Sequence, residues 1–148
     1  MKKTKNRKQS KKTIPTWIRG MIAITLIAVV GFIVWRQFSP TSGAYPLEIT
    51  VAQAAEKRDQ GAFILDVRQP EEWTQFHIPG ATLIPLGDLP SRLSEVPKDR
   101  EVVVVCRTGN RSAQGRDILR NAGYTLVTSM TGGVTEWQAQ GLPIATGE

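Results

Sequence analysis

The chain has 148 residues, enough for one globular domain and a short appendage. Its formal net charge of +6 is unevenly distributed, because residues 1–40 contain nine lysines and arginines and no acidic residue. Residues 41–148 hold the other ten of the nineteen basic residues and all thirteen acidic residues, so this part is net negative. A nucleic-acid-binding domain concentrates basic residues in its folded part, and this charge distribution excludes that class.

Residues 17–38 form a candidate transmembrane helix. The stretch from Trp17 to Trp35 is apolar at all but two positions. Nineteen helical residues rise about 28 Å, close to the thickness of the hydrocarbon core of a bilayer. Seven lysines and arginines precede the stretch within residues 1–12, whereas Arg36 alone follows it closely. By the positive-inside rule we expect a single-pass membrane protein, with a cytoplasmic N-terminus and the rest of the chain on the periplasmic or extracellular side.

A cleaved signal peptide is the alternative interpretation of this segment. Ser42-Gly43-Ala44 supplies small residues at the spacing that a signal peptidase prefers. The apolar run, however, exceeds the usual 7–15 residues of a signal-peptide core, and Arg36 lies between the run and the cleavage site. We therefore favour an uncleaved anchor, with a basic tail over 1–16, a linker over 39–46 and one exported domain over 47–148.

From residue 50 onward the chain alternates between helical and strand patterns. Thr50 and Gln53 have the spacing of a capping box, which predicts a helix over 51–60. Leucines at helical spacing predict an amphipathic element over 86–96, interrupted by Pro90. Further helices are predicted from Pro70, over 112–121 and over 134–140, and strands over 62–67, 82–85, 102–105 and 124–128. Strands that alternate with helices indicate an α/β sandwich around a mostly parallel sheet.

The only cysteine of the chain follows the predicted strand over 102–105. Four consecutive valines are typical of a strand buried on both faces of a parallel sheet. Cys106 comes directly after them, at the carboxyl end where α/β sheets bind ligands. Backbone N–H groups of the loop and the next helix would favour a thiolate there and hold an anion beside it. One cysteine permits no internal disulfide, and the arginines that flank Thr108-Gly109-Asn110 argue against an inert buried thiol.

Four segments of the chain resemble the single-domain rhodaneses, which are thiosulfate sulfurtransferases. The resemblance extends over residues 47–145. It implies a rhodanese-like three-layer sandwich, an α/β fold whose central, mostly parallel sheet is flanked by helices. Phe76 and Trp73 stand where the family usually has glycine and phenylalanine or tyrosine, so the packing around His77 stays open. The four segments are Asp66-Val67-Arg68 with Glu71-Glu72-Trp73, His77-Ile78-Pro79-Gly80-Ala81, Cys106-Arg107-Thr108-Gly109-Asn110-Arg111-Ser112, and Gly132-Gly133-Val134-Thr135-Glu136-Trp137 with Gly141-Leu142-Pro143.

The resemblance implies sulfur transfer through a persulfide on Cys106. The thiolate would take the outer sulfur of thiosulfate or a similar small anionic donor and pass it to cyanide or a thiol, with no cofactor and no metal. Asp66 would orient the loop or a neighbouring arginine, or cap the following helix, and Arg68 would pair with an acid. The substrate-binding loop would consist of Arg107, Thr108, Gly109, Asn110, Arg111 and Ser112, with the two arginines attracting the donor.

Two other functions stay open: a non-catalytic rhodanese-like module that binds or delivers sulfur, and a related cysteine phosphatase or arsenate reductase. Cysteine phosphatases use Cys-x5-Arg, whereas here the arginine falls one position earlier, at Arg111, and Ser112 holds the sixth position. The shorter loop favours a sulfur atom over a tetrahedral phosphate. His77 is the only histidine and has no companion at metal-ligand spacing, so we expect it to bond to backbone in a turn. The sequence does not specify a protein partner.

Overall fold

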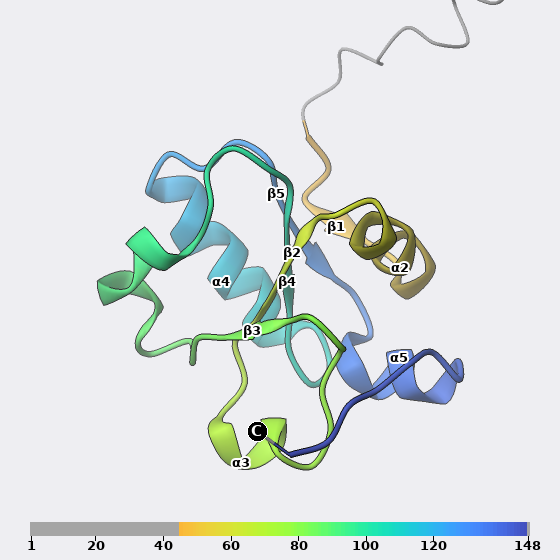
Figure 1. Ribbon diagram of the computed structural model, residues 1–148. Helices are drawn as coiled ribbons and strands as arrows, with labels where there is room; N and C mark the ends of the chain where they lie inside the picture. The colour runs from red at the N-terminus through yellow and green to blue at the C-terminus, as the bar shows by residue number, and fades with distance from the viewer. Residues whose placement is uncertain (1–44, 148) are drawn as a thin grey trace, which may run out of the picture. The chain divides into compact units, whose positions relative to one another are not determined.

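The computed structural model describes residues 45–147, in which helices alternate with the strands of a parallel sheet (Figure 1). The predicted transmembrane helix over 17–38 lies outside the described residues. Within residues 45–147, no helix has both the length and the apolar character that crossing a bilayer requires. The whole sheet and its covering helices lie within these residues.

A five-stranded sheet forms the centre of this fold, and its strand order is β1-β5-β4-β2-β3. Every pair of neighbouring strands is parallel, which confirms the predicted mostly parallel sheet. The middle strand β4 pairs with β2 from Phe63–Val102 to Asp66–Val105. The strands are β1 (Glu48–Ile49), β2 (Phe63–Asp66), β3 (Thr82–Leu83), β4 (Val102–Val105) and β5 (Val127–Met130).

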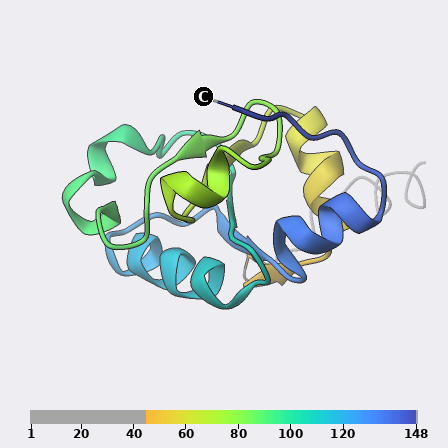
Figure 2. The ribbon, with the colours of Figure 1, turned by 90° about the horizontal axis from the view of Figure 1, so that it is seen from below.

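Helices cover both faces of the sheet, as the predicted sandwich requires. Figure 2 shows α2 and α5 on one face, and α4 with two short 3-10 turns on the other. The short helix α3 lies at the carboxyl edge of the strands (Figure 1). The elements are α2 (Val51–Asp59), α3 (Pro70–Trp73), η1 (Leu89–Ser91), η2 (Leu93–Glu95), α4 (Asn110–Asn121) and α5 (Gly133–Ala139).

Strand β4 contributes to two hydrophobic cores at once. Its valines, Val102–Val105, are all fully buried. Successive side chains of a strand point to opposite faces, so the even-numbered valines pack with Leu119 on the α4 side and the odd-numbered ones with Trp137 on the α5 side. The same alternation places Cys106 in the core on the α4 side. The continuous valine run thus reflects burial on both faces.

Helix α2 begins as its capping box predicts. The backbone N–H of Gln53 donates to Thr50 Oγ1 at 3.3 Å, and the backbone N–H of Thr50 donates to Gln53 Oε1 at 3.0 Å. Two otherwise unpaired N–H groups at the start of the helix are satisfied in this way.

The element predicted over 86–96 is not one amphipathic helix but the two 3-10 turns η1 and η2. Pro90 has no N–H group to donate, which prevents a continuous helix. The carbonyls of Leu93 and Val96 instead accept hydrogen bonds from Tyr124 Oη, at 2.5 and 3.1 Å. The leucine spacing reflects burial of this segment against the sheet rather than a helical backbone.

Other elements also differ from the sequence predictions. The strand predicted over 82–85 ends at Leu83, and the strand predicted over 124–128 extends to Met130. The strand predicted over 124–128 begins only at Val127, because Tyr124 turns inward to bond to the 3-10 segment. The two-residue strand β1 is absent from the predictions, since so short a segment has no detectable alternation. Helix α4 begins at Asn110 rather than Ser112, so Arg111 belongs to its first turn. Arg111 therefore projects from the helix, and its side chain reaches Glu72 of α3.

Candidate active site

Cys106 lies at the carboxyl end of β4 as a free thiol and is buried beneath its own loop, with 1% of its surface exposed. The backbone N–H of Gly109 donates to its Sγ at 3.1 Å. The thiol in turn donates to Ser112 Oγ at 3.7 Å. One loop amide and one hydroxyl from the first turn of α4 therefore hold the sulfur at the centre of the loop.

Ser112 connects the loop to the neighbouring strand. Its Oγ donates to the carbonyl of Gly109 at 2.6 Å and lies 3.4 Å from the carbonyl of Met130 in β5. The first bond fixes the orientation of Gly109, whose N–H points at the sulfur. Gly109 has a φ of 114°, in the left-handed region that side chains other than glycine rarely adopt.

The start of α5 packs directly on the backbone of the loop. The N–H groups of Val134 and Thr135 donate to the carbonyls of Cys106 and Arg107, at 2.8 and 3.2 Å. A Cβ atom added at Gly133 would lie only 2.3 Å from the Arg107 carbonyl oxygen. In the sequence, Gly132-Gly133 stands only at the start of one of the segments that resemble the rhodaneses. The structure shows that Gly133 permits the close approach that holds the loop.

Arg111 forms an ion pair with Glu72 of α3 instead of standing free. Its two terminal nitrogens donate to the two carboxylate oxygens, at 2.6 and 2.8 Å. These hydrogen bonds lower the pKa of Glu72 from its ordinary value of 4.5 to about 2. The same bonds are the main reason why the pKa of Arg111 is raised. The pair joins α3 to the cysteine loop across 39 residues of sequence, and sequence reasoning missed it.

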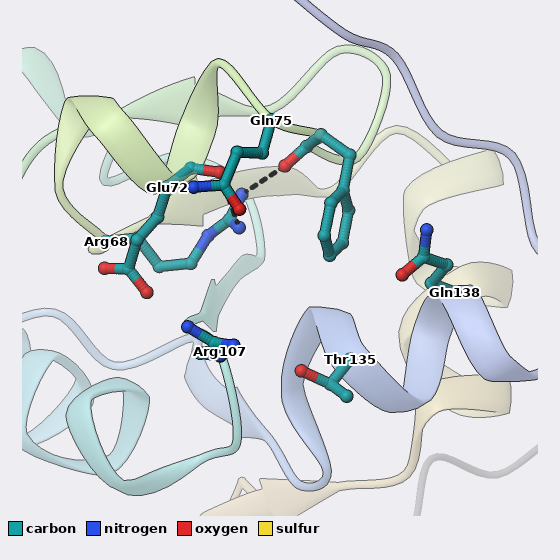
Figure 3. Close-up of a pocket in the computed structure, with 7 residues that line it drawn as sticks. Arg68, Glu72, Gln75, Arg107, Thr135 and Gln138 are labelled. Carbon is teal, nitrogen blue, oxygen red and sulfur yellow. Dashed lines mark hydrogen bonds between the residues drawn. The ribbon is translucent and has the colours of Figure 1, made fainter.

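Arg107 lines a polar pocket of about 120 Å³ beside the cysteine loop (Figure 3). Its side chain is exposed. Within the part of the chain that the structure describes, its guanidinium forms neither a hydrogen bond nor an ion pair. Figure 3 shows Thr135 and Gln138 of α5 on one side of this pocket and Glu72 and Gln75 on the other. The pocket is lined by Arg68, Glu72, Gln75, Phe76, Arg107, Thr135 and Gln138.

Asp66 and Arg68 form a buried ion pair beneath this pocket, with 0% and 2% of their surfaces exposed. Arg68 Nε donates to the two carboxylate oxygens at 3.0 and 2.9 Å. The same guanidinium donates to the carbonyls of Glu72 and Phe76, at 3.2 and 2.8 Å. Of the alternatives open for Asp66, the structure shows the one in which it orients a neighbouring arginine. Arg68 holds α3 and the turn that follows it.

The other loop residues face a different opening. Thr108, Gly109 and Asn110 line a second pocket of about 220 Å³, together with Glu48 of β1 and residues of β5. The structure therefore divides the predicted substrate-binding loop between two pockets, with Arg107 in one and Thr108–Asn110 in the other.

His77 is buried in a turn and bonds to backbone. Its Nδ1 lies 3.2 Å from the carbonyl of Trp73, and the two rings are stacked 3.7 Å apart. Its own N–H and carbonyl pair with Ala145, at 2.8 and 2.9 Å. This arrangement explains how the large Trp73 ring packs here. Among residues 45–147, no group of three or more His, Cys, Asp or Glu side chains could hold a metal ion.

This geometry suits a negatively charged sulfur. An N–H group aimed at Sγ stabilises charge on the thiol and on a sulfur atom attached to it. The guanidinium of Arg107 adds a cation that an anionic ligand reaches from solvent. The loop therefore places one N–H donor at the sulfur and one exposed cation beside it.

Comparison with known proteins assigns the chain to a family. The sequence model of the rhodanese-like domain matches residues 50–140. A sulfurtransferase of Allochromatium vinosum is 42% identical over 89 residues, which cover 60% of this chain and 83% of the relative. The putative sulfurtransferase YtwF of Bacillus subtilis is 35% identical over 98 residues, covering 65% of this chain and 94% of that protein.

A solved structure agrees with this result. The crystal structure of a rhodanese-related protein from Thermoplasma volcanium has a TM-score of 0.63 and 28% sequence identity, and the match covers 67% of this chain and 97% of that one. In this chain, the match to the family model agrees with the parallel sheet and with the cysteine at the end of β4. The chain belongs to the rhodanese-like domain family.

Proposed function

We propose that the chain is a thiosulfate sulfurtransferase that works through a Cys106 persulfide. The thiolate attacks the outer sulfur of thiosulfate, a new S–S bond forms, and sulfite leaves with the electron pair of the old S–S bond. In the second half of the cycle, cyanide or a thiolate attacks the outer sulfur of the persulfide. The electron pair of the S–S bond returns to Cys106, which regenerates the thiolate.

The hydrogen bond from the Gly109 N–H to Cys106 Sγ is the observation that carries this proposal. It needs no movement of the loop to stabilise negative charge on sulfur. Arg107 at the neighbouring pocket supplies the cation that would bind the anionic donor. A sulfur-delivery module without turnover would need the thiol but not an accessible arginine beside it.

The decisive experiment compares the wild type with Cys106→Ser in two assays, thiosulfate with cyanide and the hydrolysis of p-nitrophenyl phosphate. We expect thiocyanate formation by the wild type only, together with a mass increase of one sulfur atom on Cys106 after incubation with thiosulfate. Thiocyanate formation by Cys106→Ser would contradict the proposal. Activity on the phosphate ester alone would identify a phosphatase, and persulfide formation without turnover would identify a delivery module.

We also propose that residues 17–38 anchor the protein in the cell membrane, with the N-terminus in the cytoplasm and the rhodanese domain on the periplasmic or extracellular side. The length of the apolar stretch and the basic residues before it support this topology. The full chain should remain in the membrane fraction after washing at high pH and keep its N-terminal residues in an intact-mass measurement. Release by the wash with loss of the first forty or so residues would indicate a cleaved signal peptide instead.

A further inference from the structure

Three arginines lie in or near the pocket that Arg107 and Glu72 line, and they differ in whether a carboxylate pairs with them. Arg68 is paired with Asp66 at 2.7 Å and is almost fully buried. Arg111 is paired with Glu72 at 2.6 Å. Arg107 has no carboxylate partner among the described residues, and it lines the same pocket as Glu72. An anion entering this pocket therefore meets one unpaired guanidinium and one carboxylate.

We propose that Glu72 is a specificity-determining residue of this site: it neutralises Arg111 and so lowers the affinity for dianionic sulfur donors relative to monoanionic ones. This role of Glu72 rests on the proposed function, and it would make the site favour monoanionic sulfur donors. Glu72 acts on the donor through its own charge in the pocket and through Arg111, not by taking part in bond making.

The electrostatic argument depends on the charge of the ligand. A fixed carboxylate repels a ligand in proportion to the ligand's charge, so its effect on binding free energy is twice as large for a dianion as for a monoanion. If removal of the carboxylate charge tightens monoanion binding by some factor, dianion binding tightens by the square of that factor. Only a fifth of the Glu72 side chain is exposed (21%), so solvent screens this repulsion less than at a free surface.

Two hydrogen bonds hold the Glu72 carboxylate in place at the edge of this pocket. Its carboxylate is held by both terminal nitrogens of Arg111, so it cannot rotate out into solvent without breaking two charge-assisted bonds. The same hydrogen bonds are the largest cause of the raised pKa of Arg111. The carboxylate therefore keeps a fixed position at the pocket that it lines together with Arg107.

The neighbouring Glu71 provides a matched control. It precedes Glu72 in the same turn of α3, but its side chain is exposed and does not line the pocket. Glu71→Gln and Glu72→Gln remove the same charge from the same helix and retain similar volumes. Differences between the two variants therefore report the position of the carboxylate rather than the net charge of the protein.

The experiment measures KM and kcat of the full chain with thiosulfate, a dianion, and with methanethiosulfonate, a monoanion that donates the same kind of outer sulfur. For Glu72→Gln we expect KM to fall about twofold for methanethiosulfonate and about fourfold for thiosulfate at low salt, with similar kcat values. At 0.5 M salt the difference should shrink, because screening acts on charge and not on packing. Glu71→Gln should leave both KM values within about 1.5-fold of the wild type.

A second measurement does not require sulfur transfer. Cys106 is the only thiol in the chain, so its alkylation by iodoacetate and by iodoacetamide can be followed by mass. The ratio of the alkylation rate with iodoacetate, an anion, to the rate with neutral iodoacetamide should rise about twofold in Glu72→Gln. In Glu71→Gln this ratio should stay unchanged. Equal KM shifts for both donors, or an unchanged alkylation ratio, would overturn the role of Glu72. Absence of turnover in the wild type would refute the proposed function, and the alkylation ratio would still decide this inference.

Discussion

The three arginines near Cys106 have different environments, although their side chains are identical. Arg68 is buried and structural, Arg111 is neutralised by Glu72, and Arg107 is exposed beside the pocket. A charge in solvent is screened, whereas a buried charge must have a partner. The environment of each guanidinium therefore decides its role. The same type of substitution should change KM at one arginine and the free energy of unfolding at another.

Arg107→Ala should raise the KM for thiosulfate several-fold and change kcat little, because its guanidinium would bind the donor but makes no bond that holds the loop. Arg100→Ala is the control, since Arg100 is also exposed but precedes β4, at the opposite end of the strand from Cys106. Steady-state kinetics of both variants test this prediction. An unchanged KM in Arg107→Ala would place donor binding elsewhere, for example in the pocket of Thr108–Asn110.

Asp66→Ala should destabilise the domain by about 3–5 kcal/mol, because it leaves Arg68 as a buried charge without its carboxylate. Replacing both partners, as in Asp66→Ala with Arg68→Met, should cost less than the single substitution, because no unpaired charge remains. Urea unfolding measures both free energies. A double variant less stable than Asp66→Ala would show that Arg68 stabilises the domain mainly through the carbonyls of Glu72 and Phe76.

The Glu72–Arg111 pair should make stability depend on pH. The pKa of Glu72 is about 2 in the folded protein and about 4.5 ordinarily. A lowered pKa means that the folded state favours the ionised form, so its stabilising contribution is complete above pH 4.5 and is lost as the pH falls toward 2. The wild type should therefore lose more stability between pH 5 and pH 2.5 than Glu72→Gln, as urea titrations at each pH would show. Parallel curves would contradict the assignment.

At the residue level, sequence patterns identify site residues that are close together in the sequence. Cys106 and its loop are contiguous, so their position after a buried strand could be predicted. Glu72 and Arg111 are 39 residues apart, and their pairing depends on where α3 lies in the fold. The packing role of Gly133 is also not apparent from the sequence, because it comes from the close approach to the Arg107 backbone. A motif shows which residues are present, whereas only tertiary structure shows which of them neutralise one another.

At the scale of elements, the loop is held by two helices that come from different parts of the chain. Helix α4 supplies Ser112, which fixes Gly109, and α5 supplies the N–H groups that bind the carbonyls of Cys106 and Arg107. Cys106 is therefore positioned from both faces of the sheet. Movement of either helix should disturb the sulfur without any change to a residue that touches it.

Gly133→Ala should impair both stability and sulfur transfer. Gly133 has a φ of 64°, and an added Cβ would meet the backbone of the cysteine loop at 2.3 Å. Gly141→Ala is the control, because Gly141 has a similar φ of 71° but nothing lies within 4 Å of the added Cβ. Both variants incur the backbone strain of about 1–2 kcal/mol, and Gly133→Ala must also displace α5. Equal losses of stability and kcat in the two variants would contradict the close-approach argument.

Strands with a continuous apolar sequence are predicted more accurately than the other elements of the sheet. The valine strand β4 is predicted at its observed bounds, and β2 within one residue at each end, because burial on both faces leaves continuous apolar runs. The two-residue strand β1 and the 3-10 turns have no such pattern. Tyr124 belongs to the strand predicted over 124–128, whereas in the structure it precedes β5 and its hydroxyl bonds to the 3-10 segment. Tertiary contacts override local preference at these positions.

At the scale of the whole molecule, a chain shortened to residues 44–148 should fold and transfer sulfur like the full protein. Both hydrophobic cores and all residues of the candidate site lie within this unit. We expect a melting temperature within a few degrees of that of the detergent-solubilised full chain and a similar kcat with thiosulfate and cyanide. A large loss of stability would show that the N-terminal segment contributes to the folded domain.

The single buried thiol sets a limit on what the molecule can do alone. With one cysteine in 148 residues, a sulfur atom accepted by Cys106 has no second thiol in the same chain to receive it. Under the proposed function, each molecule stores one atom between two separate encounters, and discharge requires another molecule. Donor and acceptor therefore need never meet, and the rate of sulfur flow through the protein would be set by the slower of the two encounters.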